Sequence, residues 1–445
     1  MKSTRGFHWL CGIVVLTCSA LMTASVTNAA EMKEASTDSR TFAVVGTVSV
    51  KGMLKTPTTD PEKPNQLPLD LQGAYGYKER RLPSSGQDAR AFRSLRTFDT
   101  LTTVVTVGQQ KSEASLPVNV KRVVVEGFRE GQLCYSPDAF ISRSTVDLLS
   151  LPGDSLTALT MLPNQDVPVE GEYRPESWVM QMWAGFDAME SSELNCQLLS
   201  IKQDQATLQF TGKAKGAIDG AISTLNLKGE MVYDLKQKCV VAVKATQKEN
   251  RTISAVSPGL DVTATIAWTR QPAGSTNQIS EADLKDVTLD PSERIQWLSF
   301  RPKGWDLQMY HDRNWHVFQS LPQTAVLRLI NEGNLICQCN IARLTAARPG
   351  QHVSEDQFVS DIKTSLGAQF KELTEAGQIE SNSGRYLFRA VAKGGSETVE
   401  MNWVYYLCAD PNGKQMSFVF SVEPENMEAI AGRDLLLVES VRFDP

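Results

Sequence analysis

Apolar and polar residues alternate almost without a break from about Thr41 to Arg270. Apolar side chains recur at every second position, as in Phe42-Val44-Gly46-Val48-Val50, and Ser, Thr and Lys occupy many of the intervening positions. Alternation with period two is typical of strands that bury one face. A sheet with one wet face is usually antiparallel. The pattern therefore predicts a large, curved antiparallel β domain over residues 40–270.

One segment of this domain, Pro175 to Ser191, breaks the alternation. Its apolar residues recur at spacings of one, three and four, and they are Trp178, Val179, Met182, Trp183, Phe186 and Met189. Such spacing predicts one amphipathic helix. The Trp178–Met189 stripe has two interpretations, packing against the sheet or covering an apolar ligand. In the second interpretation the ligand would contact Trp178, Met182, Trp183 and Phe186.

The pattern changes after Arg270. Residues 271–294 are rich in Pro, Gly, Ser, Thr, Asn and acidic residues, which predicts a linker that could carry a short helix from Glu281.

In residues 295–445, Ser354 and Gln357 have the spacing of a capping box at the start of a helix. Strand-like runs occupy Ala325–Ile330, Asn334–Leu344, Tyr386–Ala392, Val399–Cys408 and Gln415–Val422, and a last helix is expected from Glu425 to about Arg433 before a strand-like Val438–Phe443. A helix inserted among antiparallel strands predicts the α+β class.

Several short motifs in this last third resemble a known fold family. They are Phe300-Arg301-Pro302-Lys303-Gly304-Trp305, the helix after Ser354, the hairpin from Trp403-Val404-Tyr405-Tyr406 to Phe418-Val419-Phe420, and the closing Glu439-Ser440-Val441-Arg442-Phe443. Residues 295–445 thereby resemble the PsbP-type α/β/α sandwich superfamily. That resemblance implies an accessory or binding protein without catalytic residues. The first domain resembles, in strand pattern and export alone, the curved-sheet lipid and lipoprotein carriers of bacterial envelopes.

The first thirty residues have the pattern of an export signal. Lys2 and Arg5 precede an apolar run from Leu10 to Met22, and a small-residue stretch ends at Ala29-Ala30. This order is typical of a cleaved signal peptide, and the run is shorter than the roughly 20 residues that cross a bilayer. We expect a signal peptide at residues 1–30, a periplasmic or extracellular protein, and no integral membrane span after cleavage.

Charge narrows the range of partners. Cleavage would remove Lys2 and Arg5 and leave 43 basic against 51 acidic residues. A net negative chain lacks the positive field that nucleic acids require. A partner is therefore expected to be a protein, a lipid or a glycan.

Six cysteines follow the predicted cleavage point, namely Cys134, Cys196, Cys239, Cys337, Cys339 and Cys408. Export would permit disulfides. Cys196 with Cys239 is the first candidate pair, because both lie at the edges of strand-like runs, and free buried thiols are the equal alternative. Cys337 and Cys339 share one side of a predicted strand with Leu335 and Ile341, which favours core packing over a disulfide or a metal site.

Catalytic motifs are incomplete. Gly153-Asp154-Ser155-Leu156 spells the nucleophile block of the GDSL hydrolases, but the late Asp-x-x-His of that family is missing, so we interpret the block as a turn between strands. The remaining histidines, His311, His316 and His352, are expected to be solvated loop residues and do not have the spacing of a metal site. No phosphate loop or dinucleotide fingerprint is found, and no cofactor is expected.

One basic cluster is left to interpret. It comprises Lys78, Arg80, Arg81, Arg90, Arg93 and Arg96. It could bind an anionic headgroup or polysaccharide, although a solvated face is the simpler interpretation.

The sequence as a whole predicts an exported, non-catalytic binding or accessory protein. The first alternative is a carrier that holds an apolar ligand between the curved sheet and the Trp178–Met189 helix. The second alternative is a serine hydrolase that uses Ser155.

Overall fold

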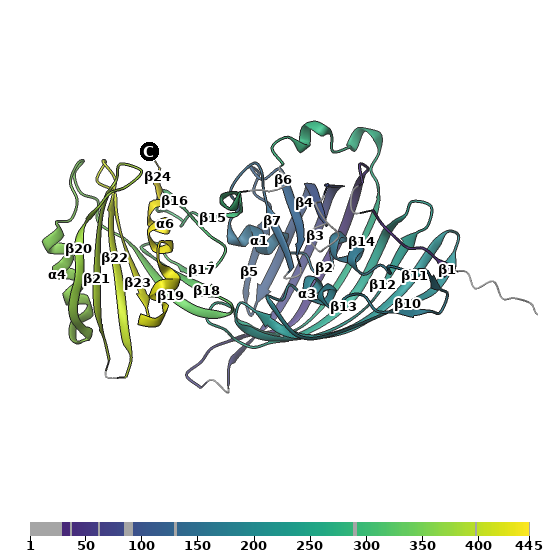
Figure 1. The fold of residues 1–445 in the computed structure, drawn as a ribbon, viewed down its shortest axis with the longest axis horizontal. Helices are drawn as coiled ribbons and strands as arrows, with labels where there is room; N and C mark the ends of the chain where they lie inside the picture. Colours follow the sequence, from purple (N-terminus) through teal and green to yellow (C-terminus); the bar gives the residue numbers. More distant parts are fainter. Residues whose placement is uncertain are drawn as a thin grey trace, which may run out of the picture.

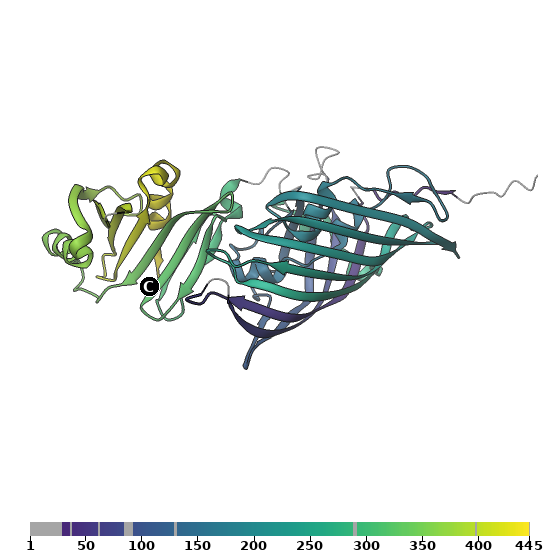
Figure 2. The ribbon, with the colours of Figure 1, turned by 90° about the horizontal axis from the view of Figure 1, so that it is seen from below.

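The computed structural model describes residues 29–35, 38–60, 63–83, 92–128, 131–287, 292–396 and 398–444. A large curved sheet and a smaller α/β body lie next to each other along the long axis (Figures 1 and 2). Most of the predicted signal peptide, residues 1–28, lies outside the described residues, as does Arg90 of the basic cluster. Within the described ranges, no helix is long and apolar enough to cross a membrane.

The N-terminal sheet is antiparallel, as predicted. Its strand order is β7-β6-β4-β3-β2-β14-β13-β12-β11-β10-β9, and β5 pairs with β4. The strands are β2 (Thr41–Thr56), β3 (Asn65–Arg81), β4 (Arg93–Val107), β5 (Gln110–Ser115), β6 (Arg122–Phe128), β7 (Gly131–Tyr135), β9 (Glu172–Tyr173), β10 (Ala188–Lys202), β11 (Gln205–Ile218), β12 (Ala221–Asp234), β13 (Cys239–Arg251) and β14 (Gly259–Pro272). Because β14 pairs with β2, the two ends of the domain meet in the middle of the sheet. Buried and exposed residues alternate along β11 and β12, as period two requires.

Helices cover the inner face of this sheet (Figure 1). They are α1 (Arg143–Leu149), α2 (Ser155–Thr160) and α3 (Trp178–Ala184). A separate two-stranded sheet of β1 (Ala29–Ala30) and β8 (Val167–Pro168) packs against the same core through Ala30 and Val167. The predicted helix over Pro175 to Ser191 is α3, but it ends early because Gly185 adopts a left-handed conformation with φ +66°. Met189 therefore lies on β10 and not on the helix. The expectation of a single helix in this domain is wrong, since α1 and α2 were not predicted.

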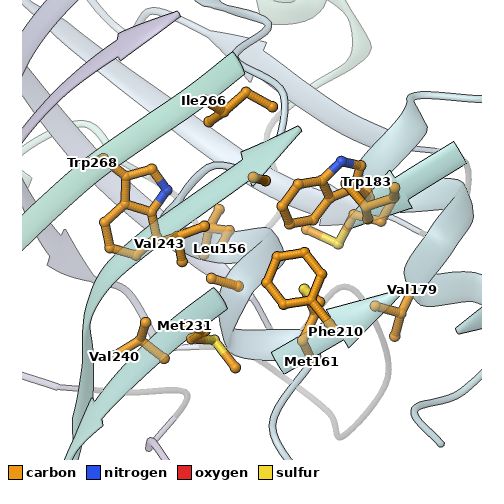
Figure 3. Close-up of a cluster of buried hydrophobic side chains, with 14 of the residues drawn as sticks. Leu156, Met161, Val179, Trp183, Phe210, Met231, Val240, Val243, Ile266 and Trp268 are labelled. Atoms are coloured by element: carbon orange, nitrogen blue, oxygen red, sulfur yellow. The ribbon is translucent and has the colours of Figure 1, made fainter. Parts of the chain in front are cut away.

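The N-terminal core lies between these helices and the sheet. Figure 3 shows Leu156 and Val179 from the helices facing Phe210, Met231 and Val243 from the strands. All five side chains are buried. The helices thus cover the sheet face to which the apolar residues of each strand point.

Residues 271–294 are not a free linker. The strand β14 extends to Pro272, and 3-10 helices follow at η2 (Ser275–Asn277), η3 (Glu281–Leu284) and η4 (Glu293–Gln296). Ile279 is buried with a small cluster at one end of the sheet. Arg122 also donates to the carbonyl groups of Asp283 and Lys285, each at 2.8 Å. The described part of this segment therefore packs against the first domain, and the short helix expected from Glu281 is η3.

The C-terminal body has helices on both faces of an antiparallel sheet. Strand order is β17-β18-β19-β23-β22-β21-β20, beside a small sheet of β15, β16 and β24. The elements are β15 (Leu298–Phe300), β16 (Leu307–His311), β17 (Trp315–Ser320), β18 (Thr324–Asn331), β19 (Asn334–Arg343), α4 (Glu355–Leu366), η5 (Gly367–Gln369), β20 (Phe370–Ile379), β21 (Tyr386–Gly395), β22 (Glu400–Ala409), β23 (Gln415–Val422), η6 (Pro424–Asn426), α5 (Met427–Ile430), α6 (Arg433–Glu439) and β24 (Arg442–Phe443). Phe358 of α4 packs on one face and Leu437 of α6 on the other.

Most of the predicted C-terminal elements are present. The side chain of Ser354 caps α4 by accepting a hydrogen bond from the Gln357 amide, although the Gln357 side chain bonds Asp361 instead of completing the box. The predicted strand Val438–Phe443 differs from the structure, because Val438 and Glu439 are the end of α6 and only Arg442–Phe443 form a strand, β24. The chain as a whole is mostly antiparallel sheet with few helices, so a mainly β description replaces the α+β class.

Candidate functional site

An apolar pocket of about 330 Å³ lies on the inner face of the N-terminal sheet, next to α1. Its apolar lining comes from the neighbouring strands β2, β3, β4 and β5, from α1 and from the segment after it, and includes Val48, Val50, Leu71, Tyr75, Leu101, Val105, Leu148 and Leu151. Its polar lining includes Thr102, Thr103, Ser144, Asp147 and Ser150. The pocket is therefore mainly apolar with a few polar groups.

The strand pattern explains why these residues meet. Residues two apart on a strand point to the same face of the sheet, which places Val48 beside Val50 and Leu71 in line with Tyr75. Gly73 lies between the last two and has no side chain, so it leaves space above β3. A Cβ added at Gly73 would meet its nearest atom, on Thr103, at 3.5 Å, an ordinary contact.

Helix α1 forms the opposite wall. Its first turn is capped by Ser142, whose hydroxyl accepts a hydrogen bond from the Thr145 amide at 3.2 Å. Leu148 and Leu149 are both buried in the domain core, and Leu148 also borders the pocket together with Ser144. The helix therefore contributes to the core and to the pocket at once.

The residues predicted to contact a ligand lie elsewhere. Val179, Met182, Trp183 and Phe186 are buried in the core, and Trp178 is partly buried against it. The Trp183 indole donates to Gln247 Oε1 at 3.0 Å, and its rings lie 5.5 Å from the Phe210 ring. Trp178, Met182, Trp183 and Phe186 do not line the apolar pocket beside α1. This packing favours the core interpretation of α3, and the ligand role of these residues stays a prediction.

The predicted pairing of Cys196 with Cys239 is wrong. Cys196 lies on β10 and Cys239 on β13, with β11 and β12 between them. Three strand spacings amount to about 14 Å, whereas a disulfide requires Cα atoms within roughly 4.4–6.8 Å. The six cysteines of the described ranges are all buried and free. Burial raises the pKa of the Cys196 thiol to about 12, so it is a poor nucleophile.

Cys337 and Cys339 pack as expected from the sequence. Both are buried on β19 together with Ile341. Leu335, expected on the same apolar face, is 44% exposed. Among the described residues no group of acidic, His and Cys side chains could hold a metal ion.

Ser155 lies in a different setting from the predicted turn between strands. It is the first residue of α2 and is only 1% exposed. Its hydroxyl donates to Glu79 Oε2 at 2.6 Å and accepts from Arg96 Nη2 at 3.2 Å. Asp154 caps the helix by accepting hydrogen bonds from two amides of the first turn. The Gly153-Asp154-Ser155-Leu156 block is therefore a helix start that is closed to solvent.

This environment does not suit a nucleophile. None of the hydrogen-bond partners described for Ser155 is a histidine. Burial would raise the pKa of Glu79, but three guanidinium groups outweigh it and lower that pKa to about 2; they belong to Arg81, Arg270 and Arg96. A carboxylate with so low a pKa is a weak general base.

A buried ion-pair network surrounds Ser155, and we call it the Glu79 network. It consists of Glu34, Glu79, Arg81, Arg96, Asp154 and Arg270. The shortest pairs join Arg270 to Glu34 at 2.6 Å and Arg96 to Asp154 at 2.8 Å. Each side chain of the network is at most 1% exposed, and three acids balance three arginines. Such balance is what burial of charge requires.

The predicted solvated basic face is consequently wrong for part of the cluster. Arg81, Arg93 and Arg96 are buried, and Arg93 pairs with Glu126 at 2.8 Å. Lys78 and Arg80 alternate with the buried positions of β3 and pair with acids at the rim. The sequence did contain a signal for the burial of Arg81. Residues two apart on a strand share a face, and the face that carries Arg81 begins with apolar residues: Tyr75, Tyr77, Glu79 and Arg81.

The histidines also differ from expectation. His311 is buried at the end of β16, and burial lowers its pKa to about 4. His316 Nε2 lies 3.6 Å from Asp219 Oδ1, across the boundary between the two bodies. The expectation of a solvated loop is therefore wrong for His311.

Comparison with known proteins yields matches among solved structures alone. No protein-family model and no curated protein matches the chain. Among solved structures, cyanobacterial PsbP (CyanoP) from Synechocystis sp. PCC 6803 matches 33% of this chain and 92% of its own, with 12% identity and a TM-score of 0.26. OmpF of Salmonella typhi matches 86% of this chain and 96% of its own at 9% identity and a TM-score of 0.12, and OccAB4 of Acinetobacter baumannii matches 88% and 99% at 5% identity and a TM-score of 0.13.

Proposed function

We propose that the N-terminal domain binds an apolar ligand of the lipid class in the pocket between the inner sheet face and α1. The observation that carries this proposal is the pocket itself, about 330 Å³ with a mainly apolar lining. Ligand pockets are commonly of this size and combine an apolar lining with a few polar groups. This proposal keeps the first alternative of the sequence analysis, a carrier of an apolar ligand. It differs in placing the ligand next to α1 and not next to α3.

The polar groups of the pocket suggest which lipids fit. Ser144 and Asp147 of α1 and Thr103 of β4 border an otherwise apolar surface. A molecule with an apolar body and a small polar head matches this division. The Asp147 carboxylate would repel an anionic head, so we expect a neutral monoacylglycerol to bind more tightly than a fatty-acid anion.

Two further parts of the sequence prediction enter this proposal. The signal pattern of residues 1–30 supports work outside the cytoplasm. The burial of Ser155 and the low pKa of its carboxylate neighbour Glu79 support a non-catalytic protein. We therefore propose an exported carrier or binding protein for a neutral lipid.

The test fills the pocket with a side chain placed on its sheet wall. In Gly73→Leu, a side chain would project from β3 into the space beside Val48 and Thr103. The matched control is Gly377→Leu, because Gly377 also lies on a strand, β20, and a Cβ there meets nothing within 4 Å.

The readout is the fluorescence titration of each protein with a fluorescent monoacylglycerol. We expect saturable binding by the wild type and the control, and binding at least about tenfold weaker in Gly73→Leu, the loss typical of a blocked apolar pocket. Thermal melts of all three confirm that folding is intact. Absence of saturable wild-type binding, or equal binding by folded Gly73→Leu, would refute the proposal.

A further inference from the structure

Helix α1 touches both the apolar pocket and the C-terminal body. Ser144, Asp147 and Leu148 border the pocket. Arg143, at the start of the same helix, donates hydrogen bonds from its guanidinium group to the carbonyl oxygens of Arg313 and, at 3.5 Å, Trp315. One short helix thus joins the candidate ligand site to the second domain.

The segment just before α1 makes further contacts with the C-terminal body. The carbonyl of Ile141 accepts a hydrogen bond from the Ser299 amide at 2.9 Å, and the carbonyl of Phe140 accepts one from the Ser299 hydroxyl at 3.2 Å. The Phe140 ring lies 4.7 Å from the Tyr310 ring. The N-terminal end of α1 is therefore bound by backbone, side-chain and ring contacts, all from beyond residue 295.

The boundary beside these contacts is incompletely filled. A cavity of about 550 Å³ lies there, lined by residues of both bodies that include Arg143, Val146, Asp219, Arg313 and His316. Small relative motion is the usual behaviour of two domains whose interface is neither large nor apolar. The cavity provides space for such motion next to the residues that bind α1.

We propose that the C-terminal domain controls ligand exchange by holding α1 against the apolar pocket; this rests on the proposed function of that pocket. A helix of seven residues is not stable by itself, so its position depends on its packing and on the contacts of its ends. Displacement of the C-terminal domain breaks the Arg143 and Ser299 contacts together. The end of α1 is then released, and the wall of the pocket that it forms opens.

The first test measures ligand release. A bound fluorescent monoacylglycerol is displaced by an excess of unlabelled lipid in a stopped-flow instrument, using the full chain. In Arg143→Gln, which does not alter the pocket lining, the release rate should rise about tenfold, the effect of losing a charge-assisted hydrogen bond. Tyr310→Ala, a change in the C-terminal domain, should act in the same direction.

The matched control is Arg328→Gln. Arg328 also reaches across the boundary, but it binds the carbonyl of Ala255, in the loop between β13 and β14, and does not contact α1. Its release rate should stay within about twofold of the wild type, the scatter expected for a remote site. An unchanged rate in Arg143→Gln, or an equal rise in Arg328→Gln, would overturn the proposal.

A second test needs no ligand, so that failure of the pocket and failure of the coupling can be told apart. Hydrogen exchange of the α1 amides should be faster in Arg143→Gln than in the wild type, and unchanged in Arg328→Gln. If α1 exchanges equally in all three proteins, the C-terminal domain does not hold it. If exchange differs as expected while no lipid binds, the coupling stands and the proposed ligand is wrong.

Discussion

The indole of Trp183 lies directly against the α-carbon of Gly153, where an added Cβ would be only 2.4 Å from the ring. Gly153 also adopts a left-handed conformation with φ +60°, and its carbonyl accepts a hydrogen bond from the Trp268 indole at 2.8 Å. Two tryptophans from distant parts of the chain thus pack on the first residue of the GDSL-like block. The block has a packing role that explains its glycine without any catalysis.

This contact predicts that Gly153→Ala destabilises the protein. Gly185→Ala is the matched control, because Gly185 has nearly the same φ, +66°, but nothing within 4 Å of an added Cβ. The left-handed conformation should cost both variants about 1–2 kcal/mol. Overpacking against Trp183 should cost Gly153→Ala a further 1–3 kcal/mol or so. Urea unfolding measures the difference, and equal losses would show that Trp183 moves aside freely.

Ser155→Ala tests the role of the buried hydroxyl. Loss of its hydrogen bond to the ionised Glu79 should reduce the free energy of unfolding by about 1–3 kcal/mol. Ser112→Ala, on the exposed strand β5, should change it by less than about 0.5 kcal/mol. A fluorophosphonate probe should not label the wild type. Covalent labelling that disappears in Ser155→Ala would show that the protein is a serine hydrolase after all.

Glu79→Gln tests the buried ion-pair network. Removing one partner of a buried pair leaves unbalanced charge, and a loss of about 3–5 kcal/mol is expected. In Glu113→Gln, which breaks the exposed pair with Lys111 on β5, the loss of stability should be much smaller, because solvent screens an exposed ion pair. Because the native pKa of Glu79 is about 2, its contribution is complete above its ordinary pKa and is lost as the pH falls toward 2. Equal losses in the two variants would mean that the network is solvated.

The buried His311 should make the free energy of unfolding depend on pH at higher pH values than Glu79 does. Its native pKa of about 4 is below the ordinary value, so protons bind the unfolded chain more tightly and stability falls as the pH drops from about 6.5 toward 4. By pH 5 the loss from this group should be about 2 kcal/mol. In His311→Phe the free energy of unfolding should change less between pH 7 and pH 5. If both proteins have the same slope, His311 does not remain neutral in the folded chain.

Much of the architecture was readable from local pattern. The alternation from Thr41 to Arg270 predicted the antiparallel sheet, because one buried face imposes period two on each strand. Ser354 and Gln357 marked the start of α4, because a cap is a local hydrogen bond. Helices α1 and α2 were missed since six or seven residues are too few to show a helical period.

What a single side chain touches was decided by the tertiary structure alone. Whether Ser155 was exposed depended on Glu79 and Arg96, more than fifty residues away along the chain. Cys196 and Cys239 cannot pair because strand order, not sequence spacing, sets the distance between them. The sequence by itself determined the strands and their apolar faces, which depend on short-range periodicity. Only folding brought α1 against the inner face of the sheet and so formed the apolar pocket, because that contact joins segments that no local pattern relates.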